Sequence, residues 1–332
     1  MTKIPTWSLI ICTYNAGDRL IKCLENLTSL DGINDSEVIV VDNDSNDESI
    51  AHLLLHDFNA KFRLFRVVTE KQRGLSFARI RGCREALGRF LLFIDDDNLP
   101  AHDFIKIAGR IFESDAKIGL IGGRSCLPND FYVRSYYRPF LRSFAVGEQH
   151  ENTGILSGSA FLWGACLCVK REALISYISS FGGFVFLDRK VNSTLSGGDG
   201  ELVISLRMMG WSAYYSKELV FVHAIASDRF SVLYLTRLYK SFGMIVRPLS
   251  VLQRAIEIKD GGTHITFKSQ LRRKICDMRQ VSSRDLPTAL CLFIMLNMIL
   301  RYYELVGAKV LKSEIAALKE RMCLIGLTCP LQ

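Results

Sequence analysis

Several features that would place this chain in an extracellular, zinc-binding or membrane-spanning class are missing from its sequence. Its ten cysteines form no CxxC pair and no zinc-type spacing, so we expect neither a disulfide framework nor a zinc finger. No signal peptide precedes the first apolar segment, which starts at Trp7. Cysteines scattered through apolar segments, together with the missing leader, predict a reduced, cytoplasmic compartment.

A hydrophobic run long enough to span a bilayer is also missing. Thr288–Leu300 is an apolar stretch of about thirteen residues, whereas a span of roughly 30 Å needs about 20. Three polar residues, Asn297, Arg301 and Glu304, are expected to interrupt any extension of it. Two interpretations remain open: a buried core helix, and an interfacial helix that the basic residues at 272–274 and 279 favour.

The net charge of +8 is concentrated in the C-terminal third of the chain. From Arg229 to the end there are 17 Lys and Arg against 7 Asp and Glu, a surplus of 10, so residues 1–228 carry about −2. No recognised nucleic-acid-binding module accompanies this charge, and we therefore expect no nucleic-acid partner. The basic third predicts peripheral attachment at the anionic inner face of the plasma membrane, with an ordinary solvated basic surface as the alternative.

What the sequence does contain is a regular alternation of short apolar runs and helix-period segments over its first 125 residues. The runs are rich in Ile, Val and Phe and almost continuously apolar, which is typical of buried parallel strands. They predict strands over residues 7–12, 37–41, 62–68, 89–94 and 118–121. Helices are predicted between them, for example over 20–27 and after a cap at Asn46 or Ser49. This alternation predicts a doubly wound α/β sheet, whose ligands bind beyond the carboxyl ends of the strands.

Polar clusters follow three of these predicted strands. They are Thr13-Tyr14-Asn15, Asp42-Asn43-Asp44-Ser45 and Asp95-Asp96-Asp97-Asn98. One such cluster is usually only a turn. Three of them, at equivalent positions of one sheet, predict a shared cleft.

The remainder of the chain reads less regularly. Residues 126–195 are expected to form loops over the cleft, except for a further core strand over the apolar run 160–169. A Gly-rich loop, 196–201, should open a helix that stops at Gly210, and a strand over 213–222 should end in His223. Residues 229–332 are predicted to form a basic, mostly helical extension.

The acidic residues suggest a metal site and a base. Asp95 and Asp97 are two apart on an extended segment, so both can face one side, and a divalent cation, Mn²⁺ or Mg²⁺, would relieve their repulsion. We expect Asp97 to bind it directly and Asp96 to face away. Asp199 or Glu201 could act as a general base, although an acidic residue at a helix start is often only a cap. His223 could be a further metal ligand or merely a core histidine.

The joint order and spacing of these segments, from about residue 7 to 245, resemble the family 2 glycosyltransferases with a GT-A fold. The matching segments are 9–15, 40–43, 92–97 and 197–202, followed by Gly210-Trp211 and His223. The resemblance implies that Thr13, Tyr14, Asn15, Asp42, Arg73, Asp95 and Asp96 surround a nucleotide sugar. It also implies that Asp95-x-Asp97 is the D-x-D metal site, with Asp97 and His223 as ligands.

The acidic loop resembles the family's G-E-D-x-E-L motif and departs from it at one position. By the resemblance Asp199 is the catalytic base and Glu201 an acceptor-side or orienting residue. Gly198 stands where the family often has Glu, and Val185-Phe186 replaces an acidic pair that often follows G-G-F. Contacts to the acceptor are therefore the part of the resemblance that transfers least.

Together these features predict an inverting glycosyltransferase of the bacterial polysaccharide type. It would move a sugar from a nucleoside-diphosphate sugar, with UDP favoured, to a hydroxyl of a glycan or lipid-linked saccharide. We expect a GT-A catalytic domain over residues 1–228, with a nucleotide-binding half to about 125 and an acceptor half from 126, and the extension over 229–332. A nucleotidyltransferase is disfavoured because no Walker-type phosphate loop occurs; a non-catalytic nucleotide-binding protein is the remaining alternative.

Overall fold

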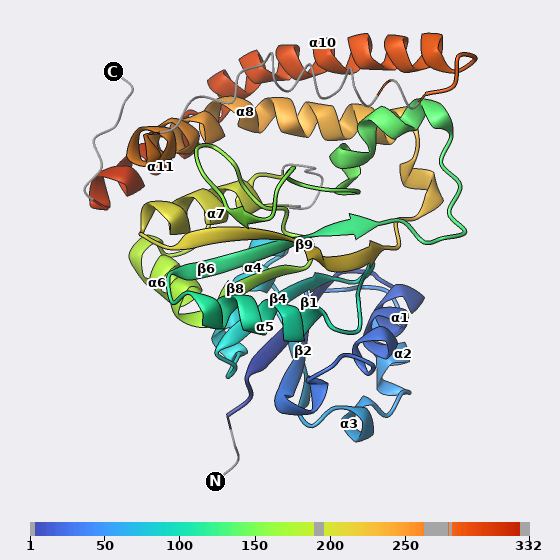
Figure 1. Cartoon of the computed structure of the whole chain (residues 1–332), viewed down its shortest axis with the longest axis vertical. Coiled ribbons are helices and arrows are strands. Elements are labelled where there is room, and N and C mark those ends of the chain that lie inside the picture. Colours follow the sequence, from blue (N-terminus) through green and yellow to red (C-terminus); the bar gives the residue numbers. More distant parts are fainter. Residues whose placement is uncertain (1–3, 189–195, 262–277, 279–280, 326–332) are drawn as a thin grey trace.

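The computed structural model describes residues 4–188, 196–261, 278 and 281–325. A nine-stranded sheet runs through the molecule in the order β3-β2-β1-β4-β8-β6-β9-β5, with β7 paired to β9 (Figure 1). The strands are β1 (Trp7–Thr13), β2 (Ser36–Asp42), β3 (Phe65–Thr69), β4 (Phe90–Asp95), β5 (Asn98–Pro100), β6 (Ile118–Cys126), β7 (Gly154–Ile155), β8 (Leu167–Lys170) and β9 (Ser212–His223). The run from β3 to β4 is parallel, whereas β8 is antiparallel to both β4 and β6. The predicted α/β class is confirmed.

Both faces of the sheet are covered, which explains the continuous apolarity of its central strands. Along β1, Leu9 and Ile11 enter one core, and Ile10 and Cys12 enter the other, because successive side chains point to opposite faces. The first core is closed by α1 (Asp18–Leu27), α2 (Ser49–Leu54), α3 (Phe58–Lys61) and α5 (Phe104–Ser114). The second is closed by α4 (Leu75–Glu85), α6 (Arg171–Phe181) and α7 (Gly198–Met208).

The strand predicted over residues 160–169 is wrong over most of its length. Only its end is a strand, β8, and the preceding residues form a loop in which Cys166 has a φ of 48°. This loop wraps around the start of α7, where a Cβ on Gly164 would clash with the carboxylate of Asp199. The apolar composition correctly indicated that this segment is buried, but not its conformation. The backbone at Gly164 passes close to the carboxylate of Asp199, and the segment forms a loop there instead of a paired strand.

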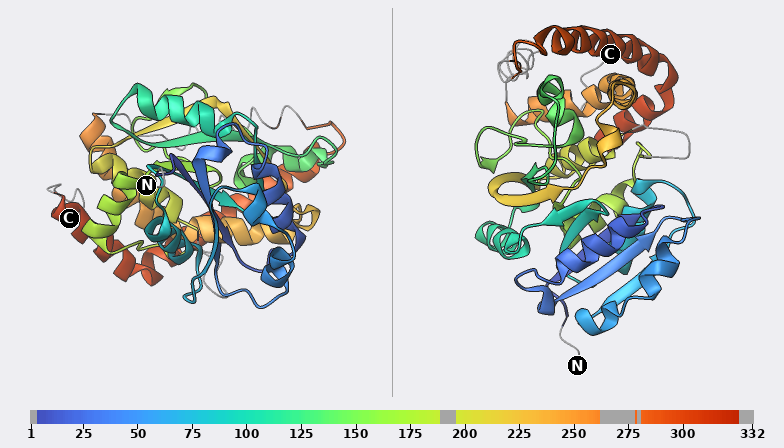
Figure 2. Two further views of the ribbon diagram at one scale, coloured as in Figure 1. Left: turned by 90° about the horizontal axis from the view of Figure 1, so that it is seen from below. Right: turned by 90° about the vertical axis from the view of Figure 1, so that its right-hand side faces the viewer.

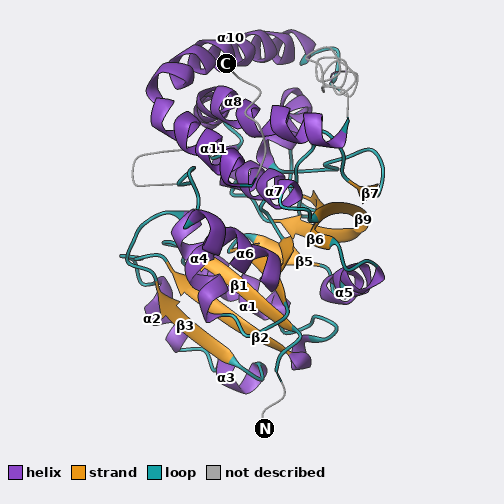
Figure 3. Cartoon of the chain, turned by 90° about the vertical axis from the view of Figure 1, so that its left-hand side faces the viewer, coloured by secondary structure: helices purple, strands orange, loops and turns teal. Residues whose placement is uncertain are grey.

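The C-terminal helices form a layer over the α7 side of the sheet, as Figures 2 and 3 show. They are α8 (Val232–Asp260), α10 (Leu286–Val310) and α11 (Lys312–Leu324). One hydrophobic cluster joins α7, α8 and α11, and a second joins α8 and α10 to the 3-10 segment η2 (Ser135–Phe144). The helical extension is thus confirmed, and its cores are shared with the sheet-bearing part across the predicted boundary at residue 228.

Helix α10 differs from the sequence prediction in its length. It runs without a break for 25 residues, through Asn297, Arg301 and Glu304, which were expected to interrupt it. Asn297 donates its side-chain amide to the carbonyl of Phe293 one turn earlier, and Glu304 is buried between two arginines. By length and composition alone the helix could cross a membrane, although this is weak evidence; only 22% of its most apolar window is buried. The buried-helix interpretation is therefore wrong for most of its surface.

Candidate functional site

The three polar clusters meet at one edge of the sheet because the strands that carry them are parallel neighbours. In the register of the sheet Thr13 lies beside Asp42, and Cys12 lies beside Asp95. The backbone N–H of Asn43 donates to the carbonyl of Thr13 (2.9 Å), which ties the first two clusters together. The hydroxyl of Thr13 donates to Asp96 (3.0 Å), which ties in the third.

Asp42 and its neighbours shape the wall of this edge. Asp42 is buried and accepts the N–H of Ser45 (3.0 Å). Asn43, which was not among the predicted site residues, donates to the carbonyls of Glu70 and Gln72 and accepts from Gly74. It therefore holds the loop that carries Arg73 against the end of β2. An amide directly after a strand is the signal that marks Asn43 in the sequence.

The rim of the edge is formed by Tyr14, which is exposed, and by Arg73 and Asn15, which are half-buried. Arg73 donates to the carboxylate of Asp44 (2.7 Å), and its guanidinium carbon lies 5.3 Å from the centre of the Tyr14 ring. Asn15 adopts a positive φ of 51° and exchanges two hydrogen bonds with Asn46. An exposed aromatic ring beside a guanidinium offers a stacking surface for a planar base.

The three consecutive aspartates point to different partners. Asp96 turns towards β1 and α1, where it accepts from Thr13 (3.0 Å) and pairs with Arg19 (3.2 Å). Burial raises the pKa of Asp96 to about 6, against the opposing effect of Arg19. Asp95 is half-buried, and its negative charge helps to raise the pKa of the buried Arg79.

Asp97 and His223 lie together, as predicted from their separate motifs. Strand β5 pairs with the end of β9, so that Asn98 lies beside His223. The His223 Nε2 atom is 3.5 Å from a carboxylate oxygen of Asp97, and the Asp97 side chain is 5% exposed. The other oxygen of Asp97 accepts from Arg229 (3.1 Å), a residue absent from the sequence predictions. Arg229 is a basic residue six positions after His223, which is too weak a signal to find it.

The Asp97–His223 pair fits a divalent metal. The His223 Nε2 atom faces a carboxylate oxygen of Asp97, whereas the other ring nitrogen, Nδ1, is buried without a hydrogen-bond partner in the described part of the chain. Within the described residues no three His, Cys, Asp or Glu side chains gather as a metal-binding group. Mg²⁺ and similar ions are often held by one or two protein ligands together with substrate phosphates. Asp97 and His223 would supply these two ligands to an ion shared with substrate phosphates.

Asp199 lies at the start of α7 and is held by two donors. One oxygen forms an ion pair with Arg79, and the other accepts the backbone N–H of Gly164 (2.9 Å). Its side chain remains 27% exposed. Arg79 is buried on α4, on the same side of the helix as Ser76, Gly82 and Cys83, and carries its charge between Asp95 and Asp199. A charged residue on an otherwise buried helical stripe is the signal that the sequence predictions missed.

Asp188 links the start of α7 to the nucleotide-side loop. Its carboxylate accepts the N–H groups of Gly197 (2.7 Å) and Gly198 (3.0 Å), and its carbonyl accepts the N–H of Leu75 (3.0 Å). Burial and the nearby charge of Asp199 raise the pKa of Asp188 to about 7. No pattern in the sequence marks this residue, because the groups that it caps lie nine and ten positions away.

Glu201 does not lie with the other predicted site residues. Its side chain is 0% exposed and faces the interior, where it accepts from Tyr177 (2.7 Å) and from the N–H groups of Val185 and Phe186. It also pairs with Arg321 of α11 (2.6 Å). A carboxylate enclosed in this way cannot reach an acceptor. Of its two predicted roles, acceptor contact and orientation, the geometry favours orientation of the start of α7.

Arg321→Ala is expected to lower the free energy of unfolding by about 3–5 kcal/mol, because it leaves the buried charge of Glu201 without its partner. Arg321 also donates to the carbonyls of Phe181 and Gly183, which lose their donor in the variant. Denaturant unfolding measures the change. Glu320→Ala, an exposed neighbour on α11, should stay within about 0.5 kcal/mol of the parent. A loss below about 1 kcal/mol for Arg321→Ala would show that α11 does not anchor α7.

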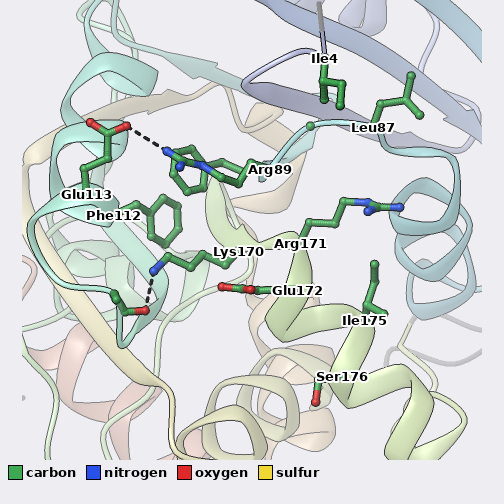
Figure 4. Close-up of a pocket in the computed structure, with 13 residues that line it drawn as sticks. Ile4, Leu87, Arg89, Phe112, Glu113, Lys170, Arg171, Glu172, Ile175 and Ser176 are labelled. Atoms are coloured by element: carbon green, nitrogen blue, oxygen red, sulfur yellow. Dashed lines mark hydrogen bonds and ion pairs between the residues drawn. The ribbon is translucent and has the colours of Figure 1, made fainter.

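A separate hollow of about 710 Å³ lies at the opposite edge of the sheet, by the amino end of β4 (Figure 4). Arg89 and Glu113 pair across its side (2.9 Å), and Lys170 donates to the carbonyl of Ala116 (2.6 Å). None of the predicted site residues lines it. The hollow is therefore separate from the polar clusters at the carboxyl edge.

Comparisons with known proteins agree with this geometry. The chain matches the model of the family described as Glycosyl transferase family 2 over residues 8–178, more than half of its length. It is 32% identical over 115 residues to the uncharacterized glycosyltransferase YfnE of Bacillus subtilis (strain 168), which covers 35% of this chain and 29% of that protein. It is 28% identical over 169 residues to the UDP-forming cellulose synthase catalytic subunit of Komagataeibacter sucrofermentans, covering 48% and 20%. These matches span less than a third of either relative.

Two solved structures share the fold over almost the whole chain. A mannosyltransferase from Pyrobaculum calidifontis, in complex with GDP-Man and Mn²⁺, superposes with a TM-score of 0.55 at 20% identity and covers 98% of this chain and 86% of that one. TarS residues 1–349 of S. aureus, in complex with UDP, gives a TM-score of 0.51 at 13% identity and covers 92% and 91%. At these identities the likeness is one of fold. The relationship itself is shown by the match to the family model. The chain therefore belongs to glycosyl transferase family 2 and has a GT-A fold.

Proposed function

We propose that this protein transfers a sugar from a nucleoside-diphosphate sugar, UDP being the expected nucleotide, to a hydroxyl of a glycan or lipid-linked saccharide. The observation that carries the proposal is that Arg79 connects two acidic segments, the one that contains Asp95 and Asp97 and the one that contains Asp199. Asp97 lies beside His223 in the first segment, and Arg79 carries its positive charge next to both Asp199 and Asp95. One segment suits a leaving diphosphate and the other suits an incoming hydroxyl.

The nucleotide would lie along the ends of β1 and β2. Tyr14 and Arg73 supply a stacking surface for the base, and Asp42 supplies a carboxylate for ribose hydroxyls. Thr13 and Asn15 hold the neighbouring backbone in place through Asp96 and Asn46. Tyr14 and Arg73 would contact the nucleotide, while the hydrogen-bonded backbone behind them keeps its conformation. Less conformational entropy is then lost on binding.

Asp97 and His223 would hold the divalent metal, Mn²⁺ or Mg²⁺. When bound, such an ion neutralises the negative charge that develops on the departing diphosphate. Arg229, which pairs with Asp97, brings a second positive charge to the same end of the site. Asp95 is half-buried and its charge acts on Arg79, and its carboxylate would accept hydrogen bonds from the sugar.

Asp199 would act as the general base in a transfer with inversion. The acceptor hydroxyl gives its proton to Asp199 as its oxygen forms a bond to the anomeric carbon, while the bond from that carbon to the diphosphate oxygen breaks. Arg79 and Gly164 fix the two carboxylate oxygens, so the base is oriented before the acceptor arrives. The partial exposure of Asp199 leaves it open to the acceptor.

Thermal unfolding in the presence of donors tests the substrate class. A UDP-sugar with Mn²⁺ should stabilise the protein by about 2.7 kcal/mol at a hundredfold excess over Kd, which raises the Tm by several degrees. GDP- and dTDP-sugars are compared at the same concentrations. A larger shift with GDP-sugars would move the proposal to that nucleotide, and no shift with any of them would contradict it. Release of pyrophosphate from a nucleoside triphosphate would indicate a nucleotidyltransferase instead.

The reaction is proposed to take place in the cytoplasm, at the inner face of the plasma membrane, where lipid-linked acceptors are exposed. The support is the surplus of 10 positive charges in residues 229–332, which an anionic lipid surface attracts. The protein would be attached peripherally.

A further inference from the structure

Helix α10 presents an apolar face to the outside of the molecule. It lies on α8 as the outermost of the described helices, with the sheet and the other described helices on one side of it (Figures 1 and 3). Its buried and exposed residues fall on opposite sides of the helix. The exposed set repeats every three or four residues along nearly the whole helix: Leu290, Ile294, Met298, Tyr302 and Leu305.

This face is exposed to an unusual degree for a folded protein. Ile294 is 57% exposed and Met298 is 69% exposed, with apolar neighbours one turn before and after. The helix is about 37 Å long, so the face is a continuous strip rather than a scattered set of side chains. Strips of this size on a soluble protein mark a surface that another partner covers.

The face of α10 opposite the apolar strip, its underside, packs tightly against α8. This packing limits how the strip can contact a membrane. Gly243 of α8 and Gly307 of α10 let the two backbones approach so closely that a Cβ on either would clash with the partner helix. Glu304, on the same underside, pairs with Arg247 (3.0 Å) and Arg301 (2.7 Å). A transmembrane orientation would break these contacts and place Glu304 in lipid, which is costly. The helix can therefore lie in the plane of a surface without leaving its own core.

The charged residues around the apolar strip indicate which kind of surface covers it. Between residues 284 and 312 the exposed charged residues are all basic: Arg284, Arg301, Lys309 and Lys312. The two acidic residues of this stretch are less accessible, since Asp285 accepts from Ser135 and Glu304 is buried. A second copy of the chain would bring like charges together. An anionic lipid surface would pair with them and cover the apolar strip as well.

We infer that the outward face of α10 is a monotopic membrane-docking surface, which lies in one leaflet of an anionic bilayer with its axis parallel to the membrane. Leu290, Ile294 and Met298 enter the boundary between headgroups and acyl chains, and the four basic residues contact lipid phosphates. In this orientation the sheet lies on the side of α10 that faces away from the lipid. The inference rests on the proposed membrane location but not on the transfer chemistry.

Flotation of the full chain with lipid vesicles tests the inference. The chain should bind vesicles of mixed phosphatidylcholine and phosphatidylglycerol more strongly than vesicles of phosphatidylcholine alone. The double variant Ile294→Glu, Met298→Glu should lower binding to the anionic vesicles by roughly tenfold or more, since it replaces apolar side chains that enter the lipid. The matched control is Leu54→Glu, Leu55→Glu, which adds the same two charges at exposed apolar positions (72% and 81%) on and just after α2. The control should keep nearly all of the binding.

Three results would overturn the inference. The first is equal binding by the α10 variant and the parent. The second is equal loss in the α10 variant and the control, which would assign the effect to net charge alone. The third is a lipid-free dimer that the α10 variant converts to a monomer, which would identify a second copy as the occupant. The donor-induced rise in Tm, measured on the same variants, shows whether they remain folded and keeps a failure of membrane docking separate from a failure of the proposed reaction.

Discussion

Asp199→Asn is expected to lower the rate of sugar transfer by about 10²–10⁴-fold, the usual contribution of a general base, while nucleotide-sugar affinity stays nearly constant. An amide cannot accept the proton of the acceptor hydroxyl. The proposed donor site uses residues at the ends of β1, β2 and β4 and does not include this carboxylate. Steady-state kinetics give the change in rate, and donor titration of the inactive variant gives the affinity.

The contacts of Asp199 predict that the Asp199→Asn variant also loses a hydrogen bond. Both carboxylate oxygens accept from N–H donors, Arg79 on one side and Gly164 on the other. An amide offers one acceptor and one donor, so one of these bonds is lost whichever way it turns. Asp228→Asn is the matched control, since Asp228 is exposed and lies just beyond the end of β9. Full activity of Asp199→Asn, with an unchanged Asp228→Asn, would assign the base to another residue.

Asp97→Ala is expected to have the second large effect, a loss of at least about 10²-fold in transfer rate together with the loss of metal-dependent donor binding. Asp97 is the carboxylate that His223 and Arg229 approach, so its removal leaves one ligand and an unpaired guanidinium. Donor titrations with and without Mn²⁺ measure the effect. In the parent, chelation should reproduce the loss of the variant and added Mn²⁺ should reverse it.

The variant itself should not respond to added Mn²⁺. His223→Gln removes the other ligand and is expected to weaken metal dependence in the same direction. A metal-independent parent, equally active after chelation, would contradict the assignment of Asp97 and His223 as ligands. Arg229 would then be the main counter-charge for the leaving diphosphate.

The positions of the donor-side residues could be predicted because they depend on local patterns. Continuous apolar runs identified β1, β2 and β4, and the polar residues that follow them had to share an edge once these strands were parallel. Asp97 and His223 could be paired through their motifs, although they are far apart in the sequence. The strand over 160–169 was wrong because apolarity reports burial and not conformation.

The family, the α/β class and the polar residues at the strand ends could all be predicted from the amino-acid sequence, because apolar periodicity and motif spacing are local properties. Which of the acidic residues stay accessible, by contrast, depends on the packing of the folded chain. Asp199 and Glu201 are two positions apart, yet Arg79 and Gly164 leave the first partly exposed, whereas Arg321, 120 residues away, encloses the second. The tertiary structure also decided that α10 packs through one side against the rest of the described chain and exposes an apolar face on the other. Burial and ion pairing depend on which distant segments pack together, and no local pattern records that.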